Sequence, residues 1–86
     1  MDQKTVRVIH LMTNQILISQ IEEVGADIGE PDCKLVEPYI IDTSTLELEP
    51  WLLNLTMQNE FMMSSDKILT LAEPTSKLLK KYEDLF

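Results

Sequence analysis

The sequence predicts a single small domain of the mainly β class: a strongly bent five-stranded barrel followed by a C-terminal helix. The chain has 86 residues, which is enough for one hydrophobic core. Between residues 5 and 73, apolar side chains alternate with polar ones in short runs separated by polar breaks. After Pro74 the apolar spacing changes to three and four residues, as in a helix. We therefore place the barrel at about 5–73 and the helix at about 75–86, within one domain spanning 1–86.

Runs of β-branched and apolar residues predict the first three strands. The run 5–11 alternates, and the polar break after it contains Asn14, a residue suited to the positive φ of a tight turn. A second strand over 16–24 begins apolar and becomes acidic, as a strand does when it emerges into solvent. A loop holding both glycines leads to a third strand over 33–42. Within it, Pro38 cannot donate to a ladder and marks an edge, a bulge or a bend.

The second half of the chain predicts two more strands and the helix. The acidic stretch 42–50 turns the chain, and large side chains then alternate over 51–57, which predicts the fourth strand. A polar turn at 64–67 precedes a short fifth strand at 68–71. Thr75 is placed to cap the helix. The apolar stripe of that helix consists of Leu78, Leu79, Tyr82, Leu85 and Phe86.

The charge of the chain restricts its partners. Fifteen acidic residues against seven basic ones give a net charge of -8, which repels phosphate backbones. Residues 1–76 hold four basic and thirteen acidic side chains, a net of -9, because Lys77, Lys80 and Lys81 lie in the predicted helix. One cysteine favours a reducing compartment, and neither a signal peptide nor an apolar run of about 20 residues is found. We expect a cytoplasmic protein that does not enter membranes.

The residues that could carry chemistry are isolated from one another. His10 falls in the middle of the first strand, and Cys33 has no second cysteine, so both are interpreted as structural. Asp27, Glu30 and Asp32 could meet a hard cation, but they lack the spacing and central glycine of a calcium loop. Phosphate-binding glycine motifs and the G-x-S-x-G motif are missing from the sequence. We expect no enzyme activity, no metal and no cofactor.

Two groups of large side chains allow a second interpretation. Met57, Phe61, Met62 and Met63 could form an adaptable contact surface of soft side chains. Trp51 could stack on a base or anchor a partner. Core packing is the interpretation that a domain of this size favours for both groups.

The order of strands and turns, together with two stretches of sequence, resembles the Sm and Sm-like proteins. The overlap covers Val6 to Leu71. Its first half, V-R-V-I-H-L-M-T-N-Q-I-L-I-S-Q-I, is similar to an alternating strand, a turn and a strand with a small residue, here Ser19, where it bends. Its second half, M-S-S-D-K-I-L-T-L, is similar to the apolar-Arg-Gly-Asp/Asn-x-Ile-x-x-Ile signature. With its C-terminal helix, the chain also resembles small Sm-like proteins of phages that infect cyanobacteria, which would act in the host cytoplasm.

The resemblance implies an SH3-type barrel and carries over four residues as an RNA site: Ser64, Ser65, Asp66 and Lys67. Two departures from the family pattern fall on RNA-contacting positions. Ser64 and Ser65 replace an Arg-Gly pair, which removes a guanidinium from the site. The Asp-x-x-x-Asn pattern between strands two and three is also missing, and Gly25 stands near the expected aspartate.

The resemblance also implies a homo-oligomeric ring of five to eight copies, in which the fourth strand of one copy pairs with the fifth of the next. The interface residues would be Leu53, Leu55, Ile68, Leu69 and Leu71, which would otherwise leave long apolar edges on a single copy. Two functions remain open. One is a ring-forming scaffold that binds RNA weakly or in a non-standard way, and the other is a ring for protein–protein assembly, an adaptor without RNA.

Overall fold

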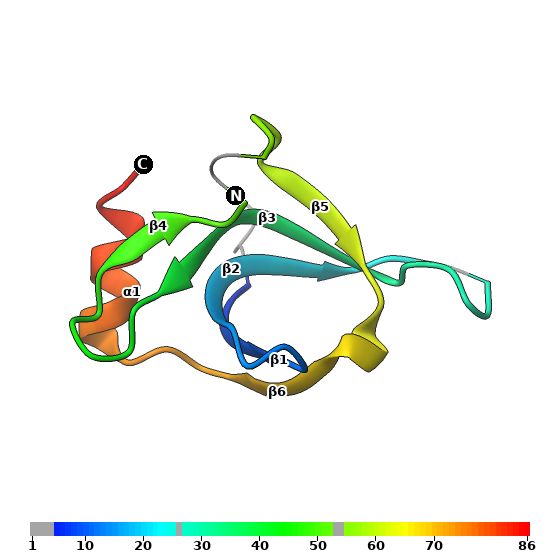
Figure 1. Cartoon of the computed structure of the whole chain (residues 1–86), viewed down its shortest axis with the longest axis horizontal. Helices are drawn as coiled ribbons and strands as arrows, with labels where there is room; N and C mark the ends of the chain where they lie inside the picture. Colours follow the sequence, from blue (N-terminus) through cyan, green and yellow to red (C-terminus); the bar gives the residue numbers. More distant parts are fainter. Residues whose placement is uncertain (1–4, 26, 53–54) are drawn as a thin grey trace.

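An antiparallel sheet of six strands and one C-terminal helix make up the fold, in a computed structural model that describes residues 5–25, 27–52 and 55–86 (Figure 1). The strand order is β4-β3-β2-β1-β6, and β5 pairs with the other half of β3. The mainly β class and the C-terminal helix are thus confirmed. The elements are β1 (Val6–Leu11), β2 (Ile16–Glu23), β3 (Cys33–Ile41), β4 (Leu48–Pro50), β5 (Glu60–Met63), the 3-10 helix η1 (Ser65–Lys67), β6 (Ile68–Ala72) and α1 (Ser76–Glu83).

The predicted turn and bend in the first hairpin are both present. Asn14 has φ 69° in the turn between β1 and β2. Ser19 is fully buried, and the register between β2 and β3 shifts between Ile18 and Gln20, on either side of it. Its single hydroxyl hydrogen is shared between the carbonyl oxygens of Gln20 (2.8 Å) and Val36 (3.1 Å). The small side chain therefore lets β2 curve and also holds the irregular backbone there.

The predicted fourth strand at 51–57 is wrong, and the reason lies in β3. Glu37 has φ 54° and Pro38 has no N–H, so the ladder is interrupted at this point of β3. β4 pairs with Tyr39–Ile41 and β5 pairs with Cys33–Val36, on either side of the interruption. Between β4 and β5 the chain leaves the ladder of β3. The Trp51 N–H donates to the Pro38 carbonyl (3.0 Å) where β4 ends, and the Glu37 N–H donates to the Asn59 carbonyl (2.7 Å) where β5 begins.

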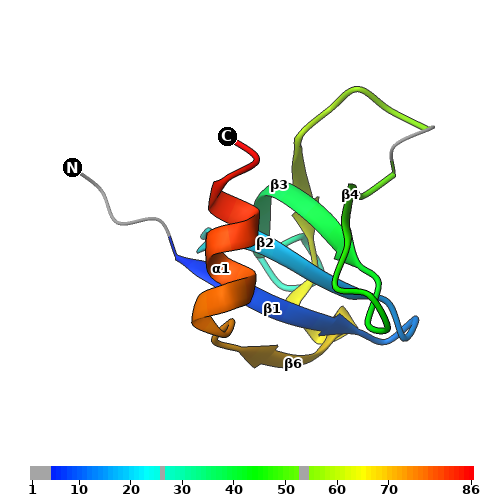
Figure 2. The same cartoon turned by 90° about the vertical axis from the view of Figure 1, so that its left-hand side faces the viewer.

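The curled sheet packs a hydrophobic cluster on each face. The concave face holds Ile9, Leu11, Leu17 and Leu35, with Trp51 and Met63 packed against them. On the outer face α1 covers β1 and β2 (Figure 2). Its Leu78 and Tyr82 are buried with Ile18 and Ile41. The sheet is therefore a curved layer that encloses one hydrophobic cluster on its concave face and packs against the helix on its outer face.

The helix begins as predicted and ends earlier. The Thr75 hydroxyl accepts a hydrogen bond from the Leu78 N–H (3.2 Å), as an N-cap does. The helix ends at Glu83, whereas the sequence predicts it to continue to about 86. Phe86 nevertheless returns to the same cluster, with its ring 5.1 Å from Tyr82 and 5.9 Å from Tyr39, both edge to face.

The sheet is open along one seam. Among the described residues, β6 pairs only with β1 and β5 pairs only with β3, so the sheet does not close into a barrel. The two edges diverge from the corner formed by η1, which joins β5 to β6 (Figure 1). No helix formed by the described residues has the length and hydropathy needed to cross a membrane.

Candidate functional site

The four residues predicted to contact RNA form the corner between β5 and β6. Ser65–Lys67 make up η1, and Ser64 precedes it in extended conformation. Asp32, at the end of the β2–β3 loop, accepts hydrogen bonds from both the N–H and the hydroxyl of Ser65, at 2.7 Å each. These bonds hold the pKa of the Asp32 carboxyl below its usual range. The corner is thus tied to a loop 33 residues away in sequence.

That loop makes the corner strongly acidic. Asp27, Glu30 and Asp32 line a shallow cavity of about 350 Å³ together with Ser64, Ser65 and Asp66. Lys67 is the only cation of the four-residue corner. An anionic phosphate chain approaching these residues would meet four carboxylates and lack the guanidinium that the two serines replace. The arrangement is therefore unfavourable for RNA.

The predicted subunit-interface residues occupy two different places. Ile68, Leu69 and Leu71 lie on β6, where Leu69 and Leu71 are 57% and 50% exposed. Leu55 lies in the connection between β4 and β5 instead of on a strand, and it is 81% exposed. Leu53 falls outside the described residues. The prediction of apolar sheet edges therefore holds on β6, whereas Leu55 belongs to a loop.

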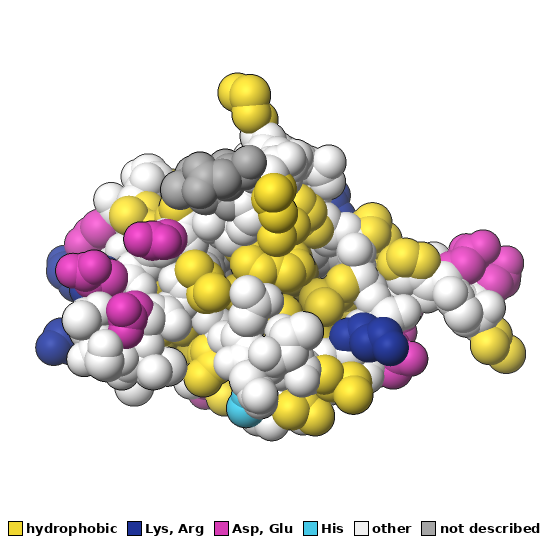
Figure 3. Space-filling view, in the orientation of Figure 1, with side chains coloured by type: hydrophobic (Ala, Val, Ile, Leu, Met, Phe, Trp, Pro, Cys, Tyr) yellow, Lys and Arg dark blue, Asp and Glu magenta, His cyan; other side chains and the backbone are white. Residues whose placement is uncertain are grey.

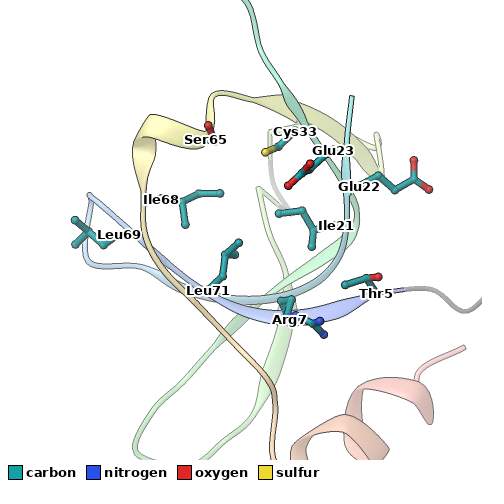
Figure 4. A pocket seen from close by; sticks show the side chains of 10 residues that line it. All are labelled: Thr5, Arg7, Ile21, Glu22, Glu23, Cys33, Ser65, Ile68, Leu69 and Leu71. Carbon is teal, nitrogen blue, oxygen red and sulfur yellow. The ribbon is translucent and has the colours of Figure 1, made fainter. Parts of the chain in front are cut away.

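The concave side of the sheet opens beside β6 as a cavity of about 710 Å³, which we call the mouth. Ile21, Ile68 and Leu71 converge on its centre, while Glu22 and Leu69 point away from it (Figure 4). Arg7, the only arginine of the chain, lies at one end of the mouth, and its guanidinium donates to the Val6 carbonyl (2.9 Å). The full lining is Thr5, Arg7, Ile21, Glu22, Glu23, Cys33, Ser65, Ile68, Leu69 and Leu71.

Sequence reasoning missed the mouth, although a signal for it exists. In β1 the pairing Ile9↔Leu17 and Ile9↔Leu71 puts the odd-numbered residues on the concave face. Among the odd-numbered residues of β1, Ile9 and Leu11 are apolar and Arg7 is charged. The charge at Arg7 is the signal in the sequence for the point where the interior opens. The sequence alone does not show that β1 pairs with β6, so it gives no means of placing Leu71 near Arg7.

Two of the side chains Met57, Phe61, Met62 and Met63 pack in the core, and the other two are exposed. Met63 packs against the concave cluster and Phe61 stacks edge to face on Trp51, with ring centroids 5.6 Å apart. Met57 and Met62 are exposed. Core packing is thus right for one pair and wrong for the other. Trp51 packs against the core cluster, as expected.

The remaining candidates for chemistry stay apart in the structure. His10 stands in β1 opposite Ile16 and Thr70. Cys33 is buried, and burial, with the charges of Asp32 and Glu23, raises the pKa of its thiol, which keeps it protonated. Within the part of the chain that the structure describes, no group of three or more His, Cys, Asp and Glu side chains is placed to hold a metal ion.

Comparison with known families finds a match over nearly the whole chain. The model of a family of unknown function, DUF6561, matches residues 4–86, and the chain therefore belongs to that family. No curated protein matches the chain significantly.

Proposed function

We propose that this member of the DUF6561 family is a ring-forming protein with an Sm-like barrel, which serves protein–protein assembly instead of binding RNA. Five to eight copies associate head to tail, with β5 of one copy pairing antiparallel with β6 of the next. The open seam is the observation that carries this proposal. It leaves two different free edges on one chain, and each edge carries an exposed apolar residue, Met62 on β5 and Leu71 on β6.

Two unlike edges lead to a ring more readily than to a dimer. A two-fold dimer uses the same patch on both copies and would leave the other edge free. A contact between β5 and β6 uses β6 on one side of the sheet and β5 on the other in every copy, and among the described strands it leaves only the three-residue strand β4 with an unpaired edge. The ring closes when the rotation between neighbouring copies divides a full turn. The strand order and the bend at Ser19 support the Sm-like character of the barrel that the pairing would complete.

The acidic corner favours the adaptor over the RNA scaffold. Repeated around a ring, the carboxylates of Asp27, Glu30, Asp32 and Asp66 would multiply, while each copy contributes one Lys67 to the corner. Fluorescence anisotropy with labelled oligo-U and oligo-A at two salt concentrations tests this directly. We expect no nanomolar binding at ~0.15 M salt. Nanomolar, salt-sensitive binding that is lost in Lys67→Ala would instead establish the RNA scaffold.

Edge pairing is tested by placing a charge on β6. Leu71 is half exposed in one copy, so Leu71→Asp leaves the single chain able to fold. Once a neighbour covers the edge, the unpaired carboxylate costs ~3–5 kcal/mol. Leu85→Asp is the matched control, because Leu85 is 46% exposed and lies beyond α1, away from both edges. We expect light scattering to show that L71D reduces the mass and L85D does not. Equal masses for both variants would place the contact elsewhere.

A further inference from the structure

The free edges alone are too small to hold two copies together. β5 has four residues and β6 has five, whereas stable interfaces use ~20–30 residues a side. Each copy also carries a net charge of -8, so the copies repel one another. An interface built on edge pairing therefore needs additional contact surface, and that surface must be poor in charge.

The connection between β4 and β5 has these properties. Residues 50–59, P-W-L-L-N-L-T-M-Q-N, are ten consecutive residues without charge in a chain that is 26% charged. The part at 55–59, which we call the apolar loop, projects from the top of the molecule in Figure 1. Met57 in it is fully exposed and Leu55 is nearly so. Methionine is enriched in the cores of interfaces, because its flexible, polarizable side chain fits irregular surfaces.

The pairing direction decides what the apolar loop meets. In antiparallel pairing the start of one strand lies opposite the end of the other, so in the register that aligns the two strands along their length Glu60 at the start of β5 would come opposite Ala72 at the end of the neighbour's β6. Ala72 pairs with Val8 of its own β1, and Arg7 and Thr5 precede Val8. In that register the residues before Glu60 would arrive at the end of the neighbour's mouth that Thr5 and Arg7 line.

We propose that the apolar loop of one copy docks in the mouth of the next copy, with Met57 against Ile21 and Leu71. The inference rests on the ring proposed above and names the second contact that the ring requires. Shape supports it, since an exposed projecting loop meets a cavity of about 710 Å³ with an apolar centre. The loop itself is uncharged, so it adds no repulsion to Glu22 and Glu23 in the lining of the mouth, and Glu60, which follows it, is paired with Lys34 of its own chain (Nζ to Oε1 2.9 Å). In Figure 3 apolar side chains gather around the centre of the face that is turned to the viewer, and acidic side chains lie on the projecting β2–β3 loop at the right.

The first test compares two substitutions at fully exposed apolar positions. Met57→Ser removes the docking side chain, and Ile28→Ser removes an equally exposed one from the β2–β3 loop. Neither side chain is buried in the single chain, so both variants should fold. We expect M57S to raise the concentration at half assembly by about tenfold or more, as the loss of one buried apolar side chain implies, and I28S to leave it unchanged. Equal effects of the two substitutions would overturn the inference.

The second test detects the contact itself. A tagged chain with Met57→Cys is mixed with an untagged chain with Thr5→Cys, and both chains also carry Cys33→Ala, because the Cys33 thiol lines the mouth and would compete for the introduced thiols. Oxidation should yield a disulfide between tagged and untagged chains, and Ile28→Cys in place of Met57→Cys should yield none. If the wild type is monomeric, the ring and the docking fail together. If the wild type assembles but no specific disulfide forms, only the docking is wrong.

Discussion

Tyr82 is the residue on which the attachment of the helix depends most. It is 1% exposed, and its hydroxyl donates to the Glu37 carbonyl at 2.8 Å, across the interruption in β3. Its ring lies edge to face with Tyr39 at 5.9 Å. Replacing Tyr82 therefore tests both the packing of α1 and the support that it gives to the positive φ of Glu37.

The expected losses follow from these contacts. Tyr82→Phe keeps the ring and removes one neutral hydrogen bond, which costs ~0.5–1.5 kcal/mol. Tyr82→Ala also removes the buried ring and costs ~3–5 kcal/mol, a large part of the ~5–15 kcal/mol that stabilises a typical domain. For a chain of this size, 1 kcal/mol corresponds to ~4–8 °C in Tm. Phe86→Ala is the control, because Phe86 touches the same rings but is 61% exposed, and edge-to-face pairs contribute ~0.5–1.5 kcal/mol.

Urea denaturation followed by circular dichroism measures all three variants. Every sample is compared at one subunit concentration, because assembly adds stability that depends on concentration. The order of loss should be Y82A greatest, with Y82F and F86A smaller and similar. If Y82A stayed within ~0.5 kcal/mol of the wild type, the range of ordinary surface substitutions, α1 would not be packed on the sheet as described.

Three further predictions concern Ser19, Asp32 and the tyrosine hydroxyls. Ser19→Val should cost ~1–3 kcal/mol in urea denaturation, since it removes the hydroxyl that two carbonyl oxygens share and adds bulk at a fully buried bend; a neutral result would mean that the bend does not need a small polar residue. Because the folded pKa of Asp32 is lowered, the stability from its bonds to Ser65 is present above the unfolded pKa of ~3.9 and is lost as pH falls through the folded pKa. The Tm difference between wild type and Asp32→Asn should therefore be larger at pH 6 than at pH 3, and a constant difference would argue against the clamp. Burial raises the pKa of Tyr82 to about 12, so the absorbance change that Tyr82→Phe removes from an alkaline titration should be centred there, whereas a change centred near the ordinary tyrosine pKa of ~10 would place Tyr82 in water.

The first half of the fold could be predicted because its local signals agree with its tertiary structure. Asn14 takes the positive φ of the turn, and Ser19 sits where the strand bends. Pro38 marks the irregularity in β3, as a residue without an N–H should. At Asn14 and Pro38 the chemistry of one residue restricts the backbone, and the restriction is visible in the sequence, whereas the bend at Ser19 was expected from the resemblance to Sm-like proteins.

The fourth strand could not be predicted correctly, because a strand also needs a partner ladder that no local pattern shows. Trp51, Leu53, Leu55 and Met57 alternate like strand residues, but alternation does not say whether a partner strand offers a continuous ladder. The interruption at Glu37 and Pro38 splits the partner, and two shorter strands at 48–50 and 60–63 take the available positions.

The candidate site depended on contacts between distant parts of the chain. Ser64–Lys67 was predicted as a turn, and it is one. Asp32 accepts a hydrogen bond from Ser65 and so brings an acidic loop to this turn. The two residues are 33 positions apart, and no local pattern encodes a contact over that distance. The pairing of β1 with β6, which forms the mouth, is equally distant in sequence.

Native mass spectrometry of the wild-type chain at micromolar concentration tests the central claim most directly. The open seam with two unlike free edges predicts a single closed species of between five and eight times the 9.9 kDa chain mass. A 9.9 kDa monomer across the micromolar range, or a dimer that does not grow further, would contradict head-to-tail assembly through β5 and β6.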